Sequence, residues 1–217
     1  MRLTKAILLV VLTCLILVSP SHAQIVPISW PDIIAQTELS IYKLQMTRFG
    51  MFGDELVGYC TGWSINELKG FIVTAAHCEG ENMLADGHKA EILYVNTTAD
   101  LMILQVSEGK KPSIKPSTKI VKKGDELLAI GYGYGFTQPV AKQCKVAVAD
   151  LVINEIEEGE RFLIADCAYI GGMSGGPVVN SEGKVISIVQ LGSPDNATGL
   201  GRVLKTIRDV VGYFGRE

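Results

Sequence analysis

Histidine is scarce in this chain, with three residues in 217, and no Cys-x-x-Cys pair is present. The spacing that commonly holds structural zinc is therefore missing. Lysine and glutamate are scattered rather than gathered into a basic stripe, which argues against nucleic acid as a partner. We accordingly expect no metal ion, no other cofactor and no bound nucleic acid.

Long apolar runs are also missing, except at the start of the chain. Arg2 and Lys5 precede an apolar run over residues 6–18, and small residues close the segment at Ala23. This layout is typical of a secretory signal peptide, here residues 1–23. An uncleaved membrane anchor is the alternative, but the run is short for a bilayer span. We expect a secreted or periplasmic protein with no stable membrane association after cleavage.

Cysteine is sparse as well, and beyond the signal segment the chain has Cys60, Cys78, Cys144 and Cys167. An even number of cysteines in an exported chain is typical of disulfides, and four cysteines allow three pairings. Reduced, buried thiols are the alternative.

Helical periodicity is almost absent. The one candidate helix is Leu204–Tyr213, where apolar residues recur near helical spacing. Residues 24–38 contain Pro27 and Pro31, and they predict an irregular lead-in or a short propeptide. The domain itself is expected over residues 39–217.

Short runs rich in Val, Ile, Leu and Tyr dominate the rest of the chain, separated by Gly, Asn, Asp and Pro. Such runs predict strands. Without helices between them, they favour an all-β barrel or sandwich. The predicted strands are Ser40–Met46, Leu56–Ile65, Gly70–Thr74, Ala90–Asn96, Leu101–Val106, Glu126–Gly131, Gln143–Ile153, Arg161–Ala168, Gly176–Val179 and Lys184–Leu191.

A glycine-rich segment, Gly171–Pro177, surrounds Ser174 and lies between two of these runs. A nucleophilic serine needs a tight turn, often with positive φ, which glycine adopts readily. In such a turn the N–H groups of Gly172 and Ser174 can point to one place and form an oxyanion hole. An ordinary glycine-rich turn is the alternative.

His77 and Asp100 are the candidate partners for that serine. A serine hydroxyl needs a base near neutral pH, and histidine suits that role. His77 follows the apolar run Phe71–Val73, whereas His88 lies in a polar turn. Asp100 directly precedes an apolar run, where its carboxylate could orient the imidazole. Taken separately, His77 could be a core histidine and Asp100 a turn residue.

Three motifs occur in a fixed order: Thr-Ala-Ala-His-Cys at residues 74–78, Asp100 before an aliphatic run, and Gly-x-Ser-Gly-Gly-Pro at residues 172–177. The motifs and their order resemble those of the trypsin/chymotrypsin-like serine proteases. The resemblance implies two six-stranded antiparallel β-barrels with a site between them and, here, a short C-terminal helix. It also implies that Ser174 is the nucleophile, His77 the base and Asp100 the acid that orients it.

The resemblance extends to the cysteines. Cys60 and Cys78 match the disulfide that braces the histidine loop in this family, which leaves Cys144 and Cys167 to pair with each other. Met173 is a departure, since the family's digestive enzymes carry an aspartate there that pairs with a newly cut N-terminus. We therefore expect no activation of that kind. The compact spacing is similar to bacterial and HtrA-like members, and we expect no PDZ module.

The resemblance places the substrate pocket at Ala168 and Tyr169, with a wall formed by Gln190, Leu191 and Gly192. Ala168 stands where trypsin-like specificity requires an aspartate, so we expect an uncharged pocket for small or medium apolar side chains. The predicted function is a secreted serine endopeptidase that acts on polypeptides as a monomer. The alternatives are a catalytically silent binding protein on the same fold and an esterase with the same triad.

Overall fold

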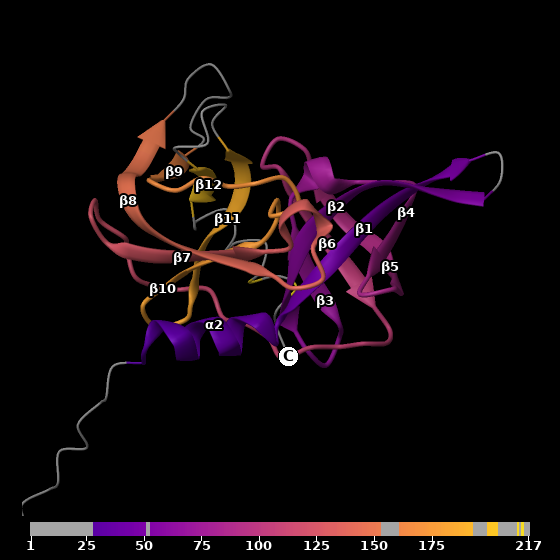
Figure 1. The fold of residues 1–217 in the computed structure, drawn as a ribbon, viewed down its shortest axis with the longest axis horizontal. Helices are drawn as coiled ribbons and strands as arrows, with labels where there is room; N and C mark the ends of the chain where they lie inside the picture. The colour runs from indigo at the N-terminus through magenta and orange to yellow at the C-terminus, as the bar shows by residue number, and fades with distance from the viewer. Residues whose placement is uncertain are drawn as a thin grey trace, which may run out of the picture.

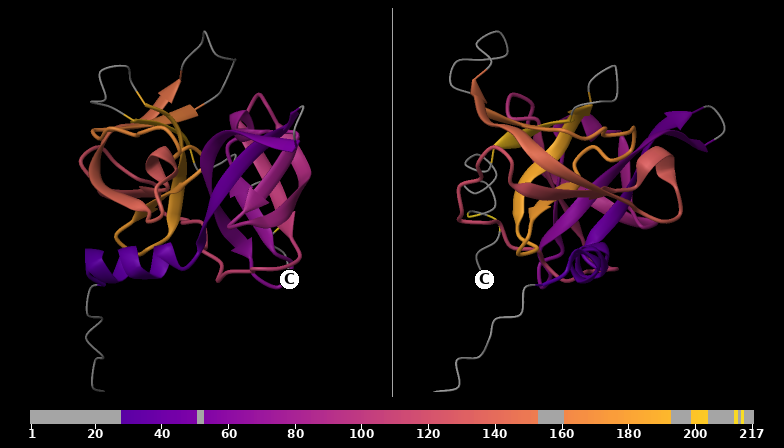
Figure 2. Two further views of the ribbon diagram at one scale, coloured as in Figure 1. Left: turned by 45° about the vertical axis from the view of Figure 1, so that its right-hand side comes forward. Right: turned by 60° about the vertical axis from the view of Figure 1, so that its left-hand side comes forward.

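Two closed antiparallel barrels of six strands each lie side by side in the computed structural model (Figures 1 and 2). This arrangement confirms the predicted fold. The predicted signal peptide, and the predicted C-terminal helix apart from Gly212, fall outside the described residues. The structure describes residues 28–50, 53–152, 161–192 and 199–203, together with Gly212 and Phe214.

Each barrel is built from six strands that are consecutive in the chain. The spatial order is β1-β2-β3-β6-β5-β4 in the first barrel and β10-β11-β12-β9-β8-β7 in the second. The first barrel contains β1 (Ile41–Gly50), β2 (Gly53–Asn66), β3 (Phe71–Thr74), β4 (Asn82–Ala85), β5 (His88–Asn96) and β6 (Leu101–Val106). The second contains β7 (Glu126–Gly131), β8 (Val140–Val152), β9 (Arg161–Ala165), β10 (Pro177–Asn180), β11 (Val185–Gly192) and β12 (Gly199–Val203).

All ten predicted strands are present, but the sequence missed two. The strand β4 has only four residues, too few for alternation to stand out, and it pairs with β1 and β5. The strand β12 reads Gly-Leu-Gly-Arg-Val, and glycine lowers the strand preference of a segment taken alone. Pairing with β9 and β11 nevertheless closes the second barrel through this segment.

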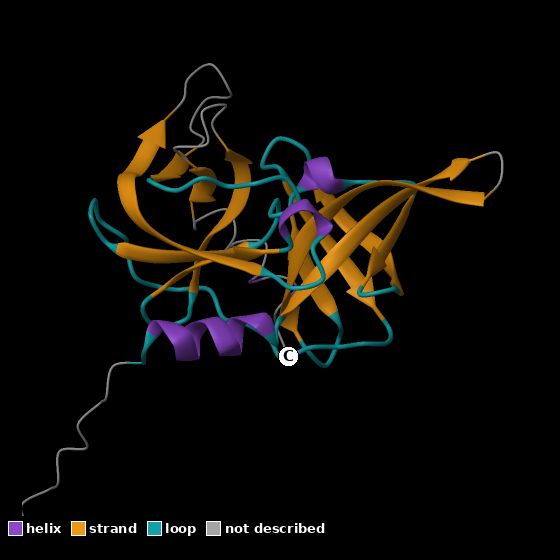
Figure 3. Cartoon of the chain, viewed as in Figure 1, coloured by secondary structure: helices purple, strands orange, loops and turns teal. Residues whose placement is uncertain are grey.

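The lead-in before the first barrel is not irregular as predicted, because Trp30–Glu38 forms the helix α2 (Figure 3). Ser29 caps the helix, with its Oγ accepting from the N–H of Asp32, and Pro31 lies in the first turn. Both features favour a helix start and could have been recognised in the sequence. Within the described part of the chain, no helix has the length and apolar character needed to span a membrane.

Buried apolar side chains form one cluster inside each barrel and a third cluster between the barrels. The third cluster joins Trp63 of the first barrel to Ile130 of the second, and Ile33 of α2 belongs to it. Ile33 and Trp63 are almost fully buried. This shared layer holds the two barrels and α2 together, and so holds the surfaces where the barrels meet.

Replacing Ile33 with alanine should lower the free energy of unfolding by about 2–5 kcal/mol, because it opens a cavity in the shared layer. Urea denaturation of the exported protein measures the change. Leu39→Ala is the matched control, since Leu39 is 65% exposed and its truncation should cost little. An unchanged unfolding midpoint for Ile33→Ala would mean that α2 is not part of the mature fold.

Candidate active site

His77 lies in a short 3-10 helix, Ala76–Cys78, directly after β3. Ala76 and Cys78 are buried, whereas the His77 side chain is 42% exposed, so the turn presents the imidazole to solvent. A disulfide joins Cys78 to Cys60 in β2. This pairing confirms the predicted brace of the histidine loop.

Asp100 lies in the turn between β5 and β6. Its φ is +47°, in the left-handed region that aspartate tolerates better than most residues. The turn is held by the Oδ1 of Asn96, which accepts from the N–H of Ala99, and by the N–H of Asp100, which donates to the carbonyl of Thr97. These local hydrogen bonds fix the backbone of the turn and therefore the direction in which the Asp100 side chain points.

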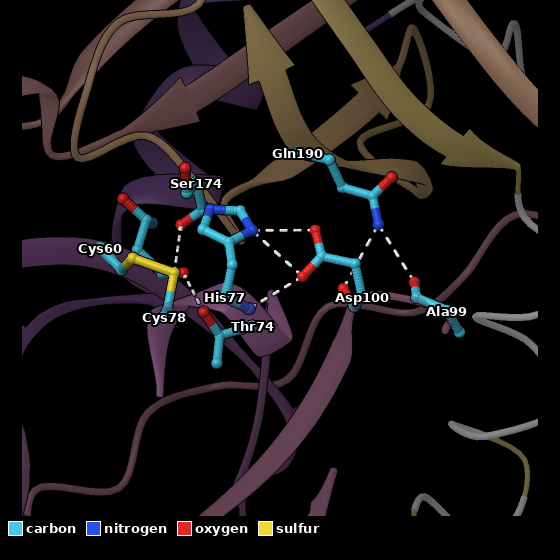
Figure 4. Close-up of polar contacts among 9 residues, drawn as sticks. Cys60, Thr74, His77, Cys78, Ala99, Asp100, Ser174 and Gln190 are labelled. Atoms are coloured by element: carbon cyan, nitrogen blue, oxygen red, sulfur yellow. Dashed lines mark hydrogen bonds and ion pairs between the residues drawn. A yellow bond between two sulfur atoms is a disulfide. The ribbon is translucent and has the colours of Figure 1, made fainter. Parts of the chain in front are cut away.

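The carboxylate of Asp100 binds His77 at two places (Figure 4). The ring Nδ1 of His77 lies 2.9 Å from Oδ2 and 3.1 Å from Oδ1, and the backbone N–H of His77 donates to Oδ1 at 2.9 Å. A neutral imidazole that donates from Nδ1 keeps Nε2 as an acceptor. Asp100 thus sets both the orientation and the tautomer of the ring.

Gln190 of β11 holds the same turn from the second barrel. Its side-chain amide donates to the carbonyl of Ala99 at 3.1 Å and to that of Asp100 at 3.3 Å (Figure 4). Gln190 is 4% exposed, so the amide is engaged inside the protein. The sequence placed Gln190 in a pocket wall and missed this contact. A long amide in the apolar run Val185–Leu191 was the available signal.

Ser174 lies beside the imidazole ring of His77, on the side away from Asp100 (Figure 4). Its carbonyl accepts from the N–H of Thr61 at 2.8 Å and lies 3.9 Å from the Sγ of Cys78. Thr61 of the first barrel therefore holds the backbone of Ser174 in the serine loop, residues 171–177. No hydrogen bond joins the Ser174 hydroxyl to His77 within the described residues.

The peptide groups around Ser174 have fixed orientations. The carbonyl of Gly171 accepts from the N–H of Tyr134 at 2.5 Å, and the carbonyl of Met173 accepts from the N–H of Gly176 at 2.9 Å. In a trans peptide the N–H points opposite to the C=O, so the N–H groups of Gly172 and Ser174 point away from these contacts. In the described part of the chain neither N–H has an acceptor. Both are available to a ligand oxygen.

Only glycine fits at position 172. Its φ is +92°, and an added Cβ would lie 2.4 Å from the carbonyl oxygen of Tyr132 and 3.0 Å from the backbone nitrogen of Tyr134. The backbone of the loop thus packs closely against residues that follow β7.

Residues 60–188, more than half of the chain, match the family model described as the trypsin-like peptidase domain. The chain belongs to the trypsin-like peptidase family. The probable periplasmic serine endoprotease DegP-like of Buchnera aphidicola subsp. Baizongia pistaciae is 33% identical over 152 residues, which are 66% of this chain and 32% of the relative. The serine endoprotease DegS of Salmonella typhimurium is 30% identical over 183 residues, covering 70% of this chain and 51% of the relative.

This trypsin-like chain therefore spans between about a third and a half of the length of these two relatives. Among solved structures, the active form of the Rv3671c protease from M. tuberculosis matches with a TM-score of 0.71 and 18% identity. The match covers 85% of each chain and shows that the two share a fold.

The predicted specificity pocket of this trypsin-like domain is described in part. Ala168 is half-buried, next to a disulfide between Cys167 and Cys144 that confirms the second predicted pairing. Tyr169 is buried in the core of the second barrel, and burial raises the pKa of its hydroxyl well above the usual range. The side chain of Leu191 and the exposure of Gly192 fall outside the described set.

The charged residue nearest to Ala168 in the sequence is Asp166. The carboxylate of Asp166 accepts from the backbone N–H of Lys145 at 2.5 Å and is exposed. The described residues contain no group of three or more His, Cys, Asp or Glu side chains that could hold a metal ion.

Proposed function

We propose that this chain is an exported serine endopeptidase with Ser174, His77 and Asp100 as its catalytic triad. One observation carries the proposal: the imidazole of His77 is bound through Nδ1 to the carboxylate of Asp100, with Ser174 on its other side. In the loop that carries Ser174, the N–H groups of Gly172 and Ser174 have no acceptor among the described residues. Together these groups supply a nucleophile, a base, an orienting acid and an oxyanion hole.

The reaction begins when the Ser174 Oγ attacks the carbonyl carbon of a peptide bond and its proton passes to Nε2 of His77. The carbonyl oxygen becomes an oxyanion that accepts from the N–H groups of Gly172 and Ser174. The C–N bond then breaks, and the leaving amine takes the proton from His77. Water, activated by the same imidazole, hydrolyses the acyl-enzyme and frees Ser174. Asp100 stabilises the imidazolium in both halves of the cycle.

The substrate is a polypeptide, and the pocket beside Ala168 selects small or medium apolar side chains, because alanine stands where trypsin-like specificity requires an aspartate and the nearby Asp166 carboxylate accepts from the backbone N–H of Lys145. We expect the protein to act as a monomer outside the cytoplasm. The predicted signal peptide over residues 1–23 supports export. The two disulfides support it too, since such bonds persist in oxidising compartments. The relatives named periplasmic agree with this location.

Mass spectrometry of the exported protein after treatment with a fluorophosphonate probe tests the proposal. We expect one adduct, on Ser174, and a mature N-terminus at Gln24, because the probe reacts with serines activated by a base. Denatured protein is the control and should not react. A folded sample that takes no label would favour the catalytically silent binding protein.

A further inference from the structure

Thr61 of β2 makes four hydrogen bonds at the meeting point of the two barrels, and it is fully buried. Its hydroxyl donates to the carbonyl of Gly172 at 2.8 Å and accepts from the N–H of Tyr132 at 2.8 Å. Its backbone N–H donates to the carbonyl of Ser174 at 2.8 Å. Its own carbonyl accepts from the Oγ1 of Thr74 at 2.9 Å, which ties it to the histidine loop.

The second barrel leaves room for this side chain. An added Cβ on Gly131 would lie 2.8 Å from the Thr61 Oγ1, and one on Gly176 would lie 3.3 Å from the Thr61 Cβ. A Cβ on Gly176 would first meet the carbonyl oxygen of Ile130 at 2.4 Å, within the second barrel, so Gly131 is the position at which a side chain would press on the threonine hydroxyl. The absence of a side chain at residue 131 therefore leaves a slot for the Thr61 side chain.

The contacts of Thr61 reach both residues whose N–H groups point away from the protein. Gly172 has no side chain to hold it, so the flanking carbonyls are what fix its backbone. Tyr134 binds the carbonyl of Gly171, and Thr61 binds the carbonyl of Gly172. Ser174 is fixed at its own carbonyl by the N–H of Thr61. A single residue of the first barrel thus contacts the carbonyls of both residues that carry these N–H groups.

We propose that Thr61 is the positioning residue of the oxyanion hole, acting through its hydroxyl on Gly172. The proposal rests on the proposed function of Ser174 and extends it to a residue that touches no substrate. Valine at this position would fill the slot but would leave the carbonyl of Gly172 and the N–H of Tyr132 without their partner. The Gly172–Met173 peptide would then keep the contact of its N–H with the carbonyl of Ile170 but lose that of its carbonyl, and the neighbouring oxyanion donor would be less well placed.

The test compares Thr61→Val with Thr61→Ser, which keeps the hydroxyl. Thr61→Val should lower kcat for a peptide amide by about ten- to a hundredfold per titrated active site, with a smaller change in KM. Its affinity for a peptide boronic acid should fall by a similar factor, because the tetrahedral adduct places an oxygen in the oxyanion hole. Thr61→Ser should restore both values to near those of the unmodified protein.

Thr47→Val is the matched control. Thr47 is also a buried threonine of the first barrel, and its hydroxyl contacts only the carbonyl of Asn82 at 3.5 Å among the described residues. This variant should keep kcat and boronate affinity. If Thr61→Val does not fold, Thr61→Ala is measured in its place with the same expectation.

A folded Thr61→Val that matches the unmodified protein in kcat and boronate affinity would overturn the proposal, even if its stability were lower. In that outcome the unmodified chain is still active, so the proposed function survives. If the unmodified chain neither cleaves peptides nor reacts with fluorophosphonate, the proposed function fails, and the role of Thr61 fails with it.

Discussion

Ser174→Ala is expected to lower kcat for peptide hydrolysis by about 10⁶-fold, on the scale of nucleophile removal in other serine proteases. The variant lacks the oxygen that forms the acyl-enzyme, while the N–H groups of Gly172 and Ser174 still face the substrate. Residual hydrolysis would come from those donors and from substrate binding. Cleavage of casein and of a chromogenic peptide amide measures the loss.

Ser107→Ala is the matched control for that change. Ser107 is an exposed serine directly after β6, outside the candidate site, and its variant should keep full activity. Circular dichroism should show both variants folded. A Ser174→Ala protein that cleaves casein at the rate of the unmodified chain would remove the proposed mechanism.

Asp100→Asn is expected to lower kcat by about 10⁴-fold near neutral pH. An asparagine amide that donates to Nδ1 of His77 would force the proton onto Nε2, the atom that must accept the serine proton. The turn should persist, because Ala99 and Asp100 are held through backbone carbonyls by Gln190. Kinetics across a pH series, with the protein checked for folding, would measure the effect.

Asp125→Asn makes the same chemical change far from His77. Asp125 is exposed, and its carboxylate accepts from the backbone N–H of Lys122 within a local turn. Activity should be unaffected. Equal losses for the two variants would show that Asp100 acts through the overall charge of the protein and not by orienting the imidazole.

Local features carried the sequence predictions that succeeded. Ten strands followed from short apolar runs between turn residues, since alternation and β-propensity belong to neighbouring residues. The candidate triad, which stays a prediction, was selected by chemistry, because few residues can serve as base or nucleophile and their order matched a known family. The helix α2 also had local signals, because Ser29 is a good N-cap and Pro31 suits the first turn. The prediction of an irregular segment instead treated Pro27 and Pro31 as helix breakers.

Contacts between segments that are distant in the chain could not be predicted from the sequence. Thr61 is an ordinary strand residue by propensity, and its hydroxyl meets Gly172, 111 positions away, only when the barrels pack. Gln190 likewise meets Ala99 across 91 positions.

The sequence by itself determined ten of the twelve barrel strands, the residues able to act as nucleophile, base and acid, and the cysteines that form the disulfides. Tertiary structure alone decided that Asp100 binds the backbone N–H and the ring Nδ1 of His77, and that Gln190 and Thr61 hold the site from opposite barrels. The physical reason is that these hydrogen bonds depend on how distant segments pack, within one barrel or between the two, which no local pattern encodes.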